Sequence, residues 1–330
     1  MKSKLISGAL TVAVAAAVSL TFNPACAADL TIKVGHGAAE GYHMHKAWLK
    51  FKEVIEDKSG GKISVEIYPN GQVGGDRELT EAVQSGIVDM TCPVIEVMAG
   101  WDDNFSIPGL PFIFGSRAEA LAALDGKFGQ SLLERAENYG LKGLGYMENG
   151  IRQITSNKCP VEKPADLKGV KIRTMQVQAH MDAFKLMGAN PTAMSFNEVY
   201  SALQQGVVDA EENPLGHITS SKFYEVQKCI TLSGHVYSTH MVLANPDFYE
   251  GLSDENKTLV EEALKEAIDH QQKIIAQEET EQVQFLADQG MKVTRLTDEQ
   301  RGEFQKITAP VRETYLKKAD PVLVEALQAK

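Results

Sequence analysis

Apolar residues recur along the chain with two different periods, which predict a mixture of strands and helices. Alternation at residues 30–35 indicates a strand. Residues 43–58 form a helix whose apolar face carries Ala47, Phe51, Val54 and Ile55. A much longer helix is predicted from its cap Ser253 to about Asp288, a length of roughly 50 Å at about 1.5 Å per residue, which is enough to cross two lobes. Residues 291–296 predict a late strand, and a capping box at Thr297 begins the closing helix.

Two stretches of the chain resemble each other. Glu78–Met90 and Glu198–Ala210 share Glu, Ala, Gln, Gly, Val and Asp at matching places 120 positions apart. Each predicts a helix that ends at a glycine cap and leads into a short apolar strand. Each also follows a strand, residues 62–68 in the first half and 170–174 in the second. A generic helix-glycine-strand connection is the alternative, but the shared context favours two βαβ-like lobes built on one plan.

The first 27 residues have the pattern of a cleaved secretory signal peptide. Two lysines precede an apolar run over residues 5–22, and the small-x-small triplet Ala25-Cys26-Ala27 predicts cleavage directly after it. A membrane anchor is the alternative, but the run is short, rich in alanine and lacks a charged flank. Asn23, three positions before Cys26, disfavours a lipoprotein signal. We therefore expect an exported protein.

Charge and composition narrow the range of possible functions. The 330-residue chain has 33 Lys and Arg against 44 Asp and Glu, a formal net charge of −11, and loss of the leader removes two more lysines. This balance argues against nucleic-acid binding, which needs basic surface to displace counterions from phosphate. A hydrophobic content of 43% and a charged content of 23% are typical of globular proteins. Any anion-binding site must then be a local group of cations.

Three cysteines remain after the leader, an odd number for an oxidising compartment. Cys159 and Cys229 each lie at the edge of a predicted strand in the same half of the chain, so we expect them to form a disulfide. Three unpaired buried thiols, with Cys92 among them, remain the alternative because sequence does not supply the Cα separation that a bridge requires. The spacing of the cysteines does not resemble a zinc site.

In a two-lobed α/β protein the ligand binds where the carboxyl ends of strands from both lobes meet. The loop 35–41 follows the first strand, but its GxGxxxG spacing is one residue longer than the dinucleotide motif. We interpret it as a ligand-facing loop in which Glu40 and His43 offer polar groups, with an ordinary glycine-rich turn as the alternative. A metal site that includes His45 is disfavoured, because His43 and His45 point in different directions at a helix start. We expect no metal and no cofactor.

Arg173, near the end of the strand 170–174, is the most informative polar residue. Alternation along the strand places Arg173 on the opposite face from Ile172. A solvated surface arginine is the alternative to a ligand-binding one. Guanidinium binds a carboxylate through two parallel hydrogen bonds, which suits a binder of small organic acids. Arg152, at the start of the second lobe's first strand, offers a second cation. Asn213 offers an amide donor, although turn asparagines as often bond their own backbone.

Phe196 precedes the second repeat helix, and it is equally consistent with a core side chain and with a side chain that packs against a ligand. The sequence has no GxSxG elbow and no Cys–His signature, so catalysis has no positive support and we expect a protein that is not an enzyme.

Several motifs together resemble one family. The motifs are Arg152–Asn157, Asp166–Arg173, Glu198–Asp209, Glu212–Pro214 and Phe223–Lys228, with Gln72–Arg77 and Leu110–Phe112 in the first half. In order and spacing they resemble the solute-binding proteins of TRAP transporters, the DctP family, over essentially the whole mature chain. The resemblance implies a periplasmic α/β protein of the two-lobed, type II-like Venus-flytrap class, with crossing strands and a long helix that spans both lobes. It also implies capture of a small organic acid and delivery to a large and a small membrane permease subunit.

The resemblance assigns roles to single residues. Arg173 matches the arginine that pairs with the ligand carboxylate, Asn213 an asparagine on the same group, Arg152 a second cationic contact, and Phe196 an aromatic wall. We add as candidate contacts Gln176, Glu40, His43, Gly37, Asp76, Cys92 and Val94. Residues of the first lobe differ from those of the sialic-acid-binding members of the family, so sialic acid is disfavoured as the ligand. The expected ligand is a C4-dicarboxylate, a sugar acid or a related carboxylate.

The expected division is a signal peptide (1–27), lobe I (28–149 and 236–276) and lobe II (150–235 and 277–330), with the ligand cleft between the lobes and flexible positions at Gly150 and Gly234. Two other functions share this pocket. A periplasmic sensor would pass a signal to a membrane partner, and an exported enzyme would need a general base or a metal beside the arginine.

Overall fold

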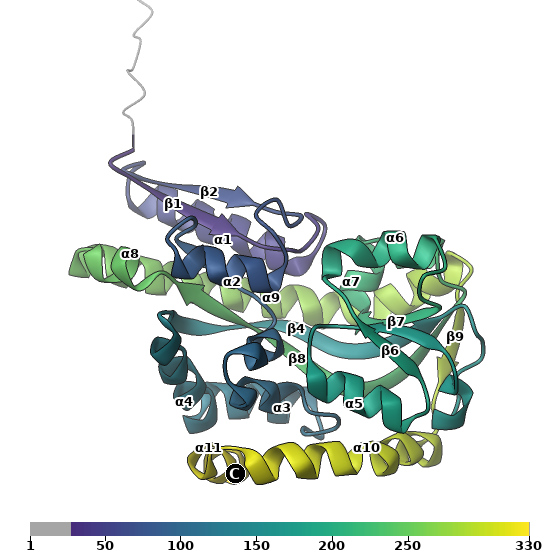
Figure 1. The fold of residues 1–330 in the computed structure, drawn as a ribbon. Helices are drawn as coiled ribbons and strands as arrows, with labels where there is room; N and C mark the ends of the chain where they lie inside the picture. The colour runs from purple at the N-terminus through teal and green to yellow at the C-terminus, as the bar shows by residue number, and fades with distance from the viewer. Residues whose placement is uncertain (1–27, 330) are drawn as a thin grey trace, which may run out of the picture.

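The computed structural model describes residues 28–329, so the predicted signal peptide lies outside the described residues. Within them, the strands form one mixed sheet in the order β2-β1-β3-β8-β4-β7-β5-β6, and a ninth strand, β9 (Lys292–Arg295), pairs with β8. Helices cover this sheet on both faces, and the molecule has two lobes (Figure 1). The α/β, two-lobed class predicted from the sequence is confirmed.

The N-terminal part of the sheet is a βαβαβ unit, which we call the N-terminal unit. It consists of β1 (Leu30–Gly35), α1 (His43–Lys58), β2 (Ile63–Tyr68), α2 (Asp76–Gln84) and β3 (Met90–Thr91). Strand β1 lies between β2 and β3 and is parallel to both. The predicted strand 30–35 and helix 43–58 are confirmed, and Ala47, Phe51, Val54 and Ile55 are all buried on the inner face of α1.

A second unit repeats this arrangement, and we call it the central unit. It consists of β5 (Lys171–Thr174), α5 (Gln178–Leu186), β6 (Asn190–Ala193), α6 (Val199–Gln204) and β7 (Ala210–Pro214). Strand β5 lies between β6 and β7, parallel to both, as β1 lies between β2 and β3. One part of the sequence interpretation was wrong. The strand that directly precedes the second repeat helix is β6, and the counterpart of β5 is β1, not β2.

The shared residues of the repeat have a structural role. Gly86 and Gly206 end their helices with φ angles of +71° and +69°, which favour glycine. The Asp89 carboxylate accepts a hydrogen bond of 2.7 Å from the backbone N–H of Lys33 on β1. The Asp209 carboxylate accepts the matching bond of 3.2 Å from Lys171 on β5. The repeated aspartate therefore joins the last strand of each unit to its central strand.

Two long strands connect the units. Strands β4 (Lys142–Ser156) and β8 (Cys229–Ala244) pair antiparallel along most of their length, while β8 also pairs with β3 and β4 with β7. The register shifts between Glu148 and Gly150 and again between Arg152 and Ile154. Arg152 was expected to start a strand, but it lies inside β4, which begins ten residues earlier. The glycines of residues 142–150 obscured this strand in the sequence, because Gly weakens a strand pattern.

Helix α9 (Asp254–Asp288) runs behind the sheet from one lobe to the other (Figure 1). It packs against α1 at one end and against α7 (Leu215–Ser220) and β9 at the other. Its predicted cap is confirmed, since the Ser253 hydroxyl accepts from the Asn256 N–H. Helix α10 (Asp298–Lys318) begins with the predicted capping box at Thr297 and contacts α5, while α11 (Pro321–Gln328) contacts α4. The remaining helices are α3 (Arg117–Asp125), α4 (Lys127–Ala136) and α8 (Pro246–Gly251).

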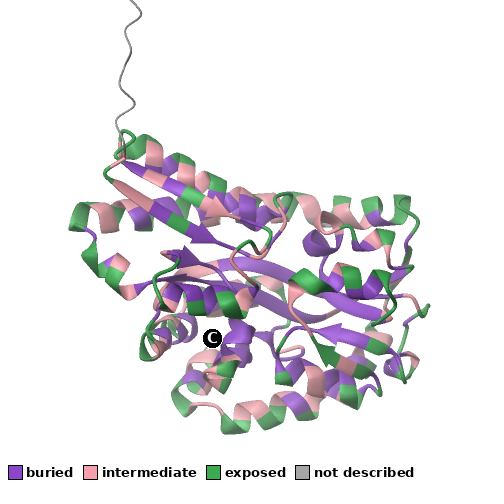
Figure 2. Ribbon diagram, turned by 45° about the horizontal axis from the view of Figure 1, so that its top comes forward, coloured by how far each residue is buried: buried purple, intermediate pink, exposed green. Residues whose placement is uncertain are grey.

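The buried side chains form several separate clusters. One contains Trp48 and Phe51 of α1 together with residues of α9, and another contains Phe184 of α5 and Phe304 of α10. Figure 2 shows the sheet strands as the most buried part and the outer helix faces as exposed. A disulfide joins Cys159 to Cys229, with a Cα separation of 6.1 Å, while Cys92 is a free, buried thiol. A further cluster contains Val94 and Val97 together with Met175 and Val177, so the two halves of the chain also share buried contacts.

Candidate functional site: a cavity between the two lobes

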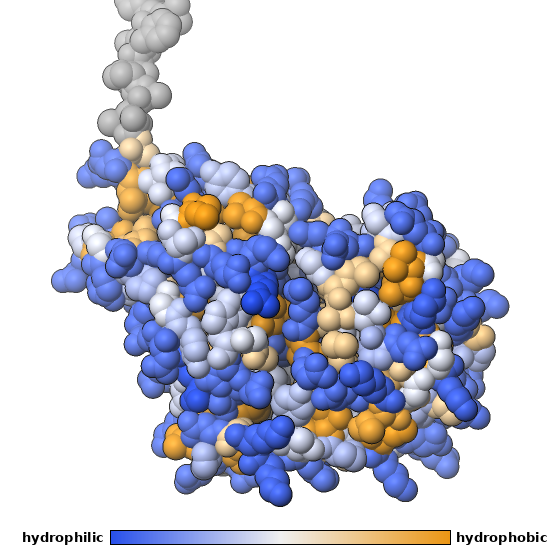
Figure 3. Space-filling model, viewed as in Figure 1, coloured by the Kyte–Doolittle hydropathy of each residue, from blue (hydrophilic) through white to orange (hydrophobic). Residues whose placement is uncertain are grey.

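The carboxyl ends of the strands from both units meet at a cavity between the lobes. Figure 3 shows a groove between the lobes on this side of the molecule. From the N-terminal unit and the loop after it, the cavity is lined by Gly37, Ala38, Met44, Gly75, Asp76 and Val94. From the central unit and the crossing strands, it is lined by Asn149, Arg152, Arg173, Met175, Phe196, Asn197, Asn213, His217 and His240.

Arg173 reaches the cavity from the carboxyl end of β5 and is only 2% exposed. Its Nε and Nη2 donate to the backbone oxygen of Met194, at 3.0 and 2.8 Å. Its Nη1 is buried and has no hydrogen-bond partner among residues 28–329. The Phe196 ring lies 6.0 Å from the guanidinium carbon. Burial and then repulsion from Arg152 lower the pKa of Arg173 to about 10, although Glu212, Glu211 and Asp76 act in the opposite direction. Arg173 is therefore a desolvated cation that makes no direct ion pair among residues 28–329.

Arg152, on β4, is also fully buried but has a partner. Its Nε donates to Glu212 Oε2 at 2.5 Å, and its Nη2 donates to Glu212 Oε1 at 2.8 Å. Burial alone would raise the pKa of Glu212, but the Arg152 charge together with the hydrogen bonds from His235 and Arg152 outweighs burial and holds that pKa far below its usual range. This is a bidentate pair, which is the strongest form of an arginine–carboxylate contact. Arg152 Nη1 is the part of this group that has no partner in the described chain.

Asn213, on β7, is held in place from both sides. Its Oδ1 accepts from Arg152 Nη2 at 3.2 Å, and its Nδ2 donates to Glu211 Oε2 at 2.5 Å. Glu211 also accepts from the Thr155 hydroxyl at 2.6 Å. Burial raises the pKa of Glu211 to about 7 despite these two hydrogen bonds. The Asn213 amide is therefore oriented before any ligand arrives.

The opposite wall has a different character. Asp76, the first residue of α2, is its one ionisable side chain among the described lining residues. Burial raises the pKa of the Asp76 carboxyl to about 6, against the opposing effects of the Val94 backbone amide and of Arg173. Two glycines, Gly71 and Gly75, lie beside Asp76 at the edge of the cavity, and we call this edge the lip. A Cβ on Gly75 would lie 2.5 Å from Ser195 Oγ, and a Cβ on Gly71 would lie 2.2 Å from the Asn197 amide nitrogen. The two lobes are therefore in close contact at this lip.

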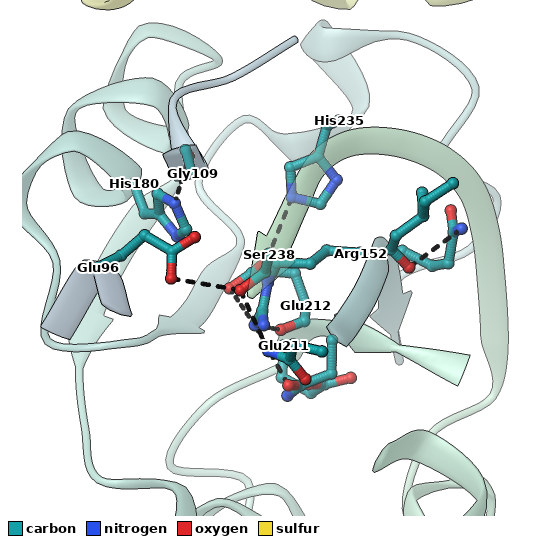
Figure 4. A network of polar contacts seen from close by, with 12 residues as sticks. Glu96, Gly109, Arg152, His180, Glu211, Glu212, His235 and Ser238 are labelled. Atoms are coloured by element: carbon teal, nitrogen blue, oxygen red, sulfur yellow. Dashed lines mark hydrogen bonds and ion pairs between the residues drawn. The ribbon is translucent and has the colours of Figure 1, made fainter. Parts of the chain in front are cut away.

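Behind the arginines lies a buried polar network (Figure 4). His235 Nε2 lies 3.2 Å from Glu212 Oε2, and the Ser238 hydroxyl donates to Glu96 Oε2 at 3.3 Å. His180 Nε2 donates to the Gly109 backbone oxygen at 2.8 Å. Burial raises the pKa of Glu96 to about 8, so this side chain is protonated at neutral pH. The network keeps β7, β8 and the segment around Glu96 in a fixed arrangement beneath the cavity.

Comparison with known proteins identifies the family. The model of the bacterial extracellular solute-binding proteins, family 7 (DctP), matches residues 34–318. The chain belongs to this family. It is 33% identical, over 96% of its length and 95% of the relative's, to the 2,3-diketo-L-gulonate-binding periplasmic protein YiaO of Escherichia coli. It is likewise 33% identical to the C4-dicarboxylate-binding periplasmic protein DctP of Rhodobacter capsulatus, over 100% of this chain and 99% of that protein.

Solved structures of family 7 proteins have the same fold. The sugar acid binding protein of Advenella mimigardefordensis, in complex with galactonate, has a TM-score of 0.88 and 35% identity, covering 91% of this chain and 97% of that one. A TRAP periplasmic solute-binding protein of Sulfurospirillum deleyianum with bound succinate has a TM-score of 0.87 and 32% identity, covering 92% and 99%. These matches confirm the two-lobed TRAP solute-binding fold for the present chain.

Seven of the eleven residues predicted to contact a ligand line the cavity of this family 7 protein. They are Arg173, Asn213, Arg152, Phe196, Gly37, Asp76 and Val94. Four others lie elsewhere. Glu40 is exposed and accepts from Asn70 at 3.4 Å, and Gln176 is exposed beyond the end of β5. His43 is buried behind the cavity, where it accepts from Gln271 Nε2 at 3.0 Å. Cys92 points into the core, where Trp48 Nε1 lies 3.0 Å from its sulfur.

Some residues in or behind the cavity have no assigned role in the sequence interpretation. Glu212 entered it only as part of a motif, and its pairing with Arg152 bridges 60 positions that local patterns do not connect. His217 and His240 lie in a helix and in a long strand whose apolar patterns hide them. The two adjacent acids before Asn213 in a buried strand were the available signal, because buried carboxylates need cationic partners.

No group of three or more His, Cys, Asp or Glu within residues 28–329 is placed to hold a metal ion. No helix in the same part of the chain is long and apolar enough to cross a membrane.

Proposed function

We propose that this chain is the periplasmic solute-binding subunit of a TRAP transporter, exported by its leader. It captures a small organic acid between its lobes and delivers it to the large and small membrane permease subunits. One observation carries the proposal. Arg173 is a buried cation at the cavity wall, with an N–H group that has no partner in the described part of the chain. A ligand carboxylate supplies both the charge and the acceptor that this group lacks.

The second arginine supports the same role in a different way. The charge of Arg152 is balanced by Glu212, so its free Nη1 adds a hydrogen-bond donor without adding net charge. The Asn213 amide lies beside it, held by Glu211. A carboxylate on Arg173 therefore meets donors that are already oriented, so little conformational entropy is lost on binding. Relatives that bind gulonate-type acids, galactonate or succinate support the ligand class.

Closure of the lobes completes the proposed mechanism. We propose that lobe I comprises residues 28–149 and 236–276 and lobe II residues 150–235 and 277–330. Gly150 and Gly234, at register shifts of the crossing strands, have φ angles of +120° and +54° and act as the flexible positions. Closing the cleft removes water, which strengthens the contact between Arg173 and its carboxylate. In the structure α11 contacts α4, so the C-terminal segment extends across to the first lobe.

Replacing Arg173 tests the proposal. A thermal-shift screen over C4-dicarboxylates, sugar acids, keto acids and sulfonates first supplies a ligand, because binding to the folded state raises Tm. By calorimetry, Arg173→Met is expected to weaken binding of that acid at least about 100-fold, or about 2.7 kcal/mol. Arg173→Lys should recover only part of the loss, because an ammonium group lacks the planar fork.

Lys171→Met is the matched control, since Lys171 lies two residues earlier on β5 and is exposed. It should leave affinity unchanged. Binding by Arg173→Met within about threefold of wild type, less than about 1 kcal/mol, would refute the role of Arg173. Delivery is tested separately: uptake of the acid into vesicles that contain both permease subunits should require this protein.

A further inference from the structure

The two walls of the interlobe cavity carry different charges. On the arginine side, Glu212 pairs with Arg152 through two hydrogen bonds, so Arg173 is the lining cation that makes no direct ion pair among the residues that the structure describes. A site with one unbalanced guanidinium matches one carboxylate. A second carboxylate on the same ligand needs a cation of its own, because an unpaired buried charge is strongly unfavourable.

The opposite wall does not supply that cation. Asp76 is its only ionisable lining residue in the described chain, and the others there are glycine, alanine, methionine and valine. A carboxylate of the ligand placed against this wall would meet the Asp76 carboxylate, and like charges at short range repel strongly inside a closed cavity. A hydroxyl group at the same place would instead donate a hydrogen bond to the Asp76 carboxylate. An ionised carboxylate accepts a stronger hydrogen bond than a neutral oxygen does.

The remaining polar groups of the cavity are neutral. His217 Nδ1 and His240 Nδ1 are buried and have no partner among residues 28–329. Burial and then the neighbouring His240 and His43 hold the pKa of His217 well below its usual range, while burial and then Arg152 lower the pKa of His240 to about 3. A neutral imidazole accepts or donates a single hydrogen bond, as a hydroxyl does, so both rings suit hydroxyl groups better than a second anion.

We infer that the ligand is a hydroxylated monocarboxylate of the aldonic-acid type. Its single carboxylate contacts Arg173, and a hydroxyl group donates to Asp76. C4-dicarboxylates bind weakly because their second carboxylate meets Asp76 without a cation. Asp76 is thus the residue that determines specificity. This inference rests on the proposed capture of an organic acid by Arg173 and narrows the class of that acid.

Calorimetry with wild-type protein tests the inference at pH 8, where the Asp76 carboxyl, with a pKa of about 6, and both carboxyl groups of a dicarboxylate are ionised. The probes are D-erythronate and D-gluconate on one side and succinate and L-malate on the other. L-malate carries a hydroxyl, so its weak binding reports on the second carboxylate and not on a missing hydroxyl. The better aldonate should bind at least about 30-fold more tightly than either dicarboxylate.

Asp76→Asn removes the charge and keeps the shape. The preference for the aldonate should shrink at least about tenfold, with L-malate binding more tightly than it does to wild type. Glu81→Gln is the control, because Glu81 is an exposed acid on the same helix; it should leave the preference unchanged. Far-UV spectra and Tm show whether each variant is folded.

The outcomes separate the two proposals. If succinate or L-malate binds wild type as tightly as the aldonates, the inference is wrong while the capture of organic acids stands. An unchanged preference in a folded Asp76→Asn variant likewise overturns the role of Asp76. If no acid of the screen binds wild type, or Arg173→Met binds as wild type does, the proposed function itself fails.

Discussion

The N-terminal and central units have the same strand order and the same aspartate contact, yet their carboxyl ends differ chemically. The end of β7 carries Glu211, Glu212 and Asn213, all buried. The matching positions at the end of β3, displaced by 120 residues, are Thr91, Cys92 and Pro93, which carry no charge. The central unit and the adjoining strand β4 therefore hold buried arginines with oriented partners, while the N-terminal unit presents glycines and Asp76. The common fold is set by the repeat, and the function is set by residues at the strand ends.

The largest expected effect concerns the buried ion pair between strand β4 and the central unit. Arg152→Met leaves the Glu212 carboxylate buried, with His235 Nε2, 3.2 Å away, as its remaining side-chain hydrogen-bond partner in the described chain. We expect the free energy of unfolding to fall by about 3–5 kcal/mol, as is typical when one partner of a buried ion pair is removed. Urea denaturation measures the change. The double variant Arg152→Met/Glu212→Gln should recover much of the loss, whereas equal stability of the single variant and wild type would show that the pair is not needed.

The N-terminal unit is probed at the lip formed by Gly71 and Gly75. Gly75→Ala places a methyl group 2.5 Å from Ser195 Oγ, so the lobes cannot close fully. Ligand affinity should fall about tenfold, or about 1.4 kcal/mol, with little change in Tm. Ser195→Gly in the same protein should restore affinity. Gly302→Ala is the control, because a Cβ there meets nothing within 4 Å. If the Ser195 variant does not rescue binding, the effect of Gly75→Ala does not arise from this contact.

The smallest effect compares the two units directly. Asp89→Ala and Asp209→Ala each remove one carboxylate–amide hydrogen bond between a last strand and its central strand. We expect each to lower the free energy of unfolding by about 1 kcal/mol, and the two losses to be similar. Thermal and urea unfolding of both variants provide the comparison. A loss confined to one variant would show that the structural repeat is not matched by equal energetics.

Strong periodicity explains which elements could be predicted from the sequence. The bounds of β1, α1 and α9 follow from regular patterns and, for α9, from the Ser253 cap, and they match the structure. Strand β6 was missed because its four residues include Pro191 and alternate poorly, as expected at a sheet edge. The length of β4 was missed because Gly143, Gly145 and Gly150 interrupt its pattern.

The site was predictable only in part, for a related reason. Position near a strand end indicated Arg173, which lines the cavity, because strand ends converge there. Position did not show which way a side chain points, so the candidates included Cys92, which faces the core, and His43, which lines a separate pocket with Asn149 and Gly216. The partner of Arg152 depends on β4 lying beside β7, a non-local contact that no local pattern contains.

The crossing strands β4 and β8 also limit how the molecule can move. They form a hydrogen-bonded ribbon and not a pair of loose loops, and their bulges are the places where such a ribbon bends. In the closure proposed above, relative rotation of the lobes follows that bending direction. The Asp76 wall is then expected to meet the Arg173 wall in the same register each time the cleft closes, so that the geometry of recognition is reproduced.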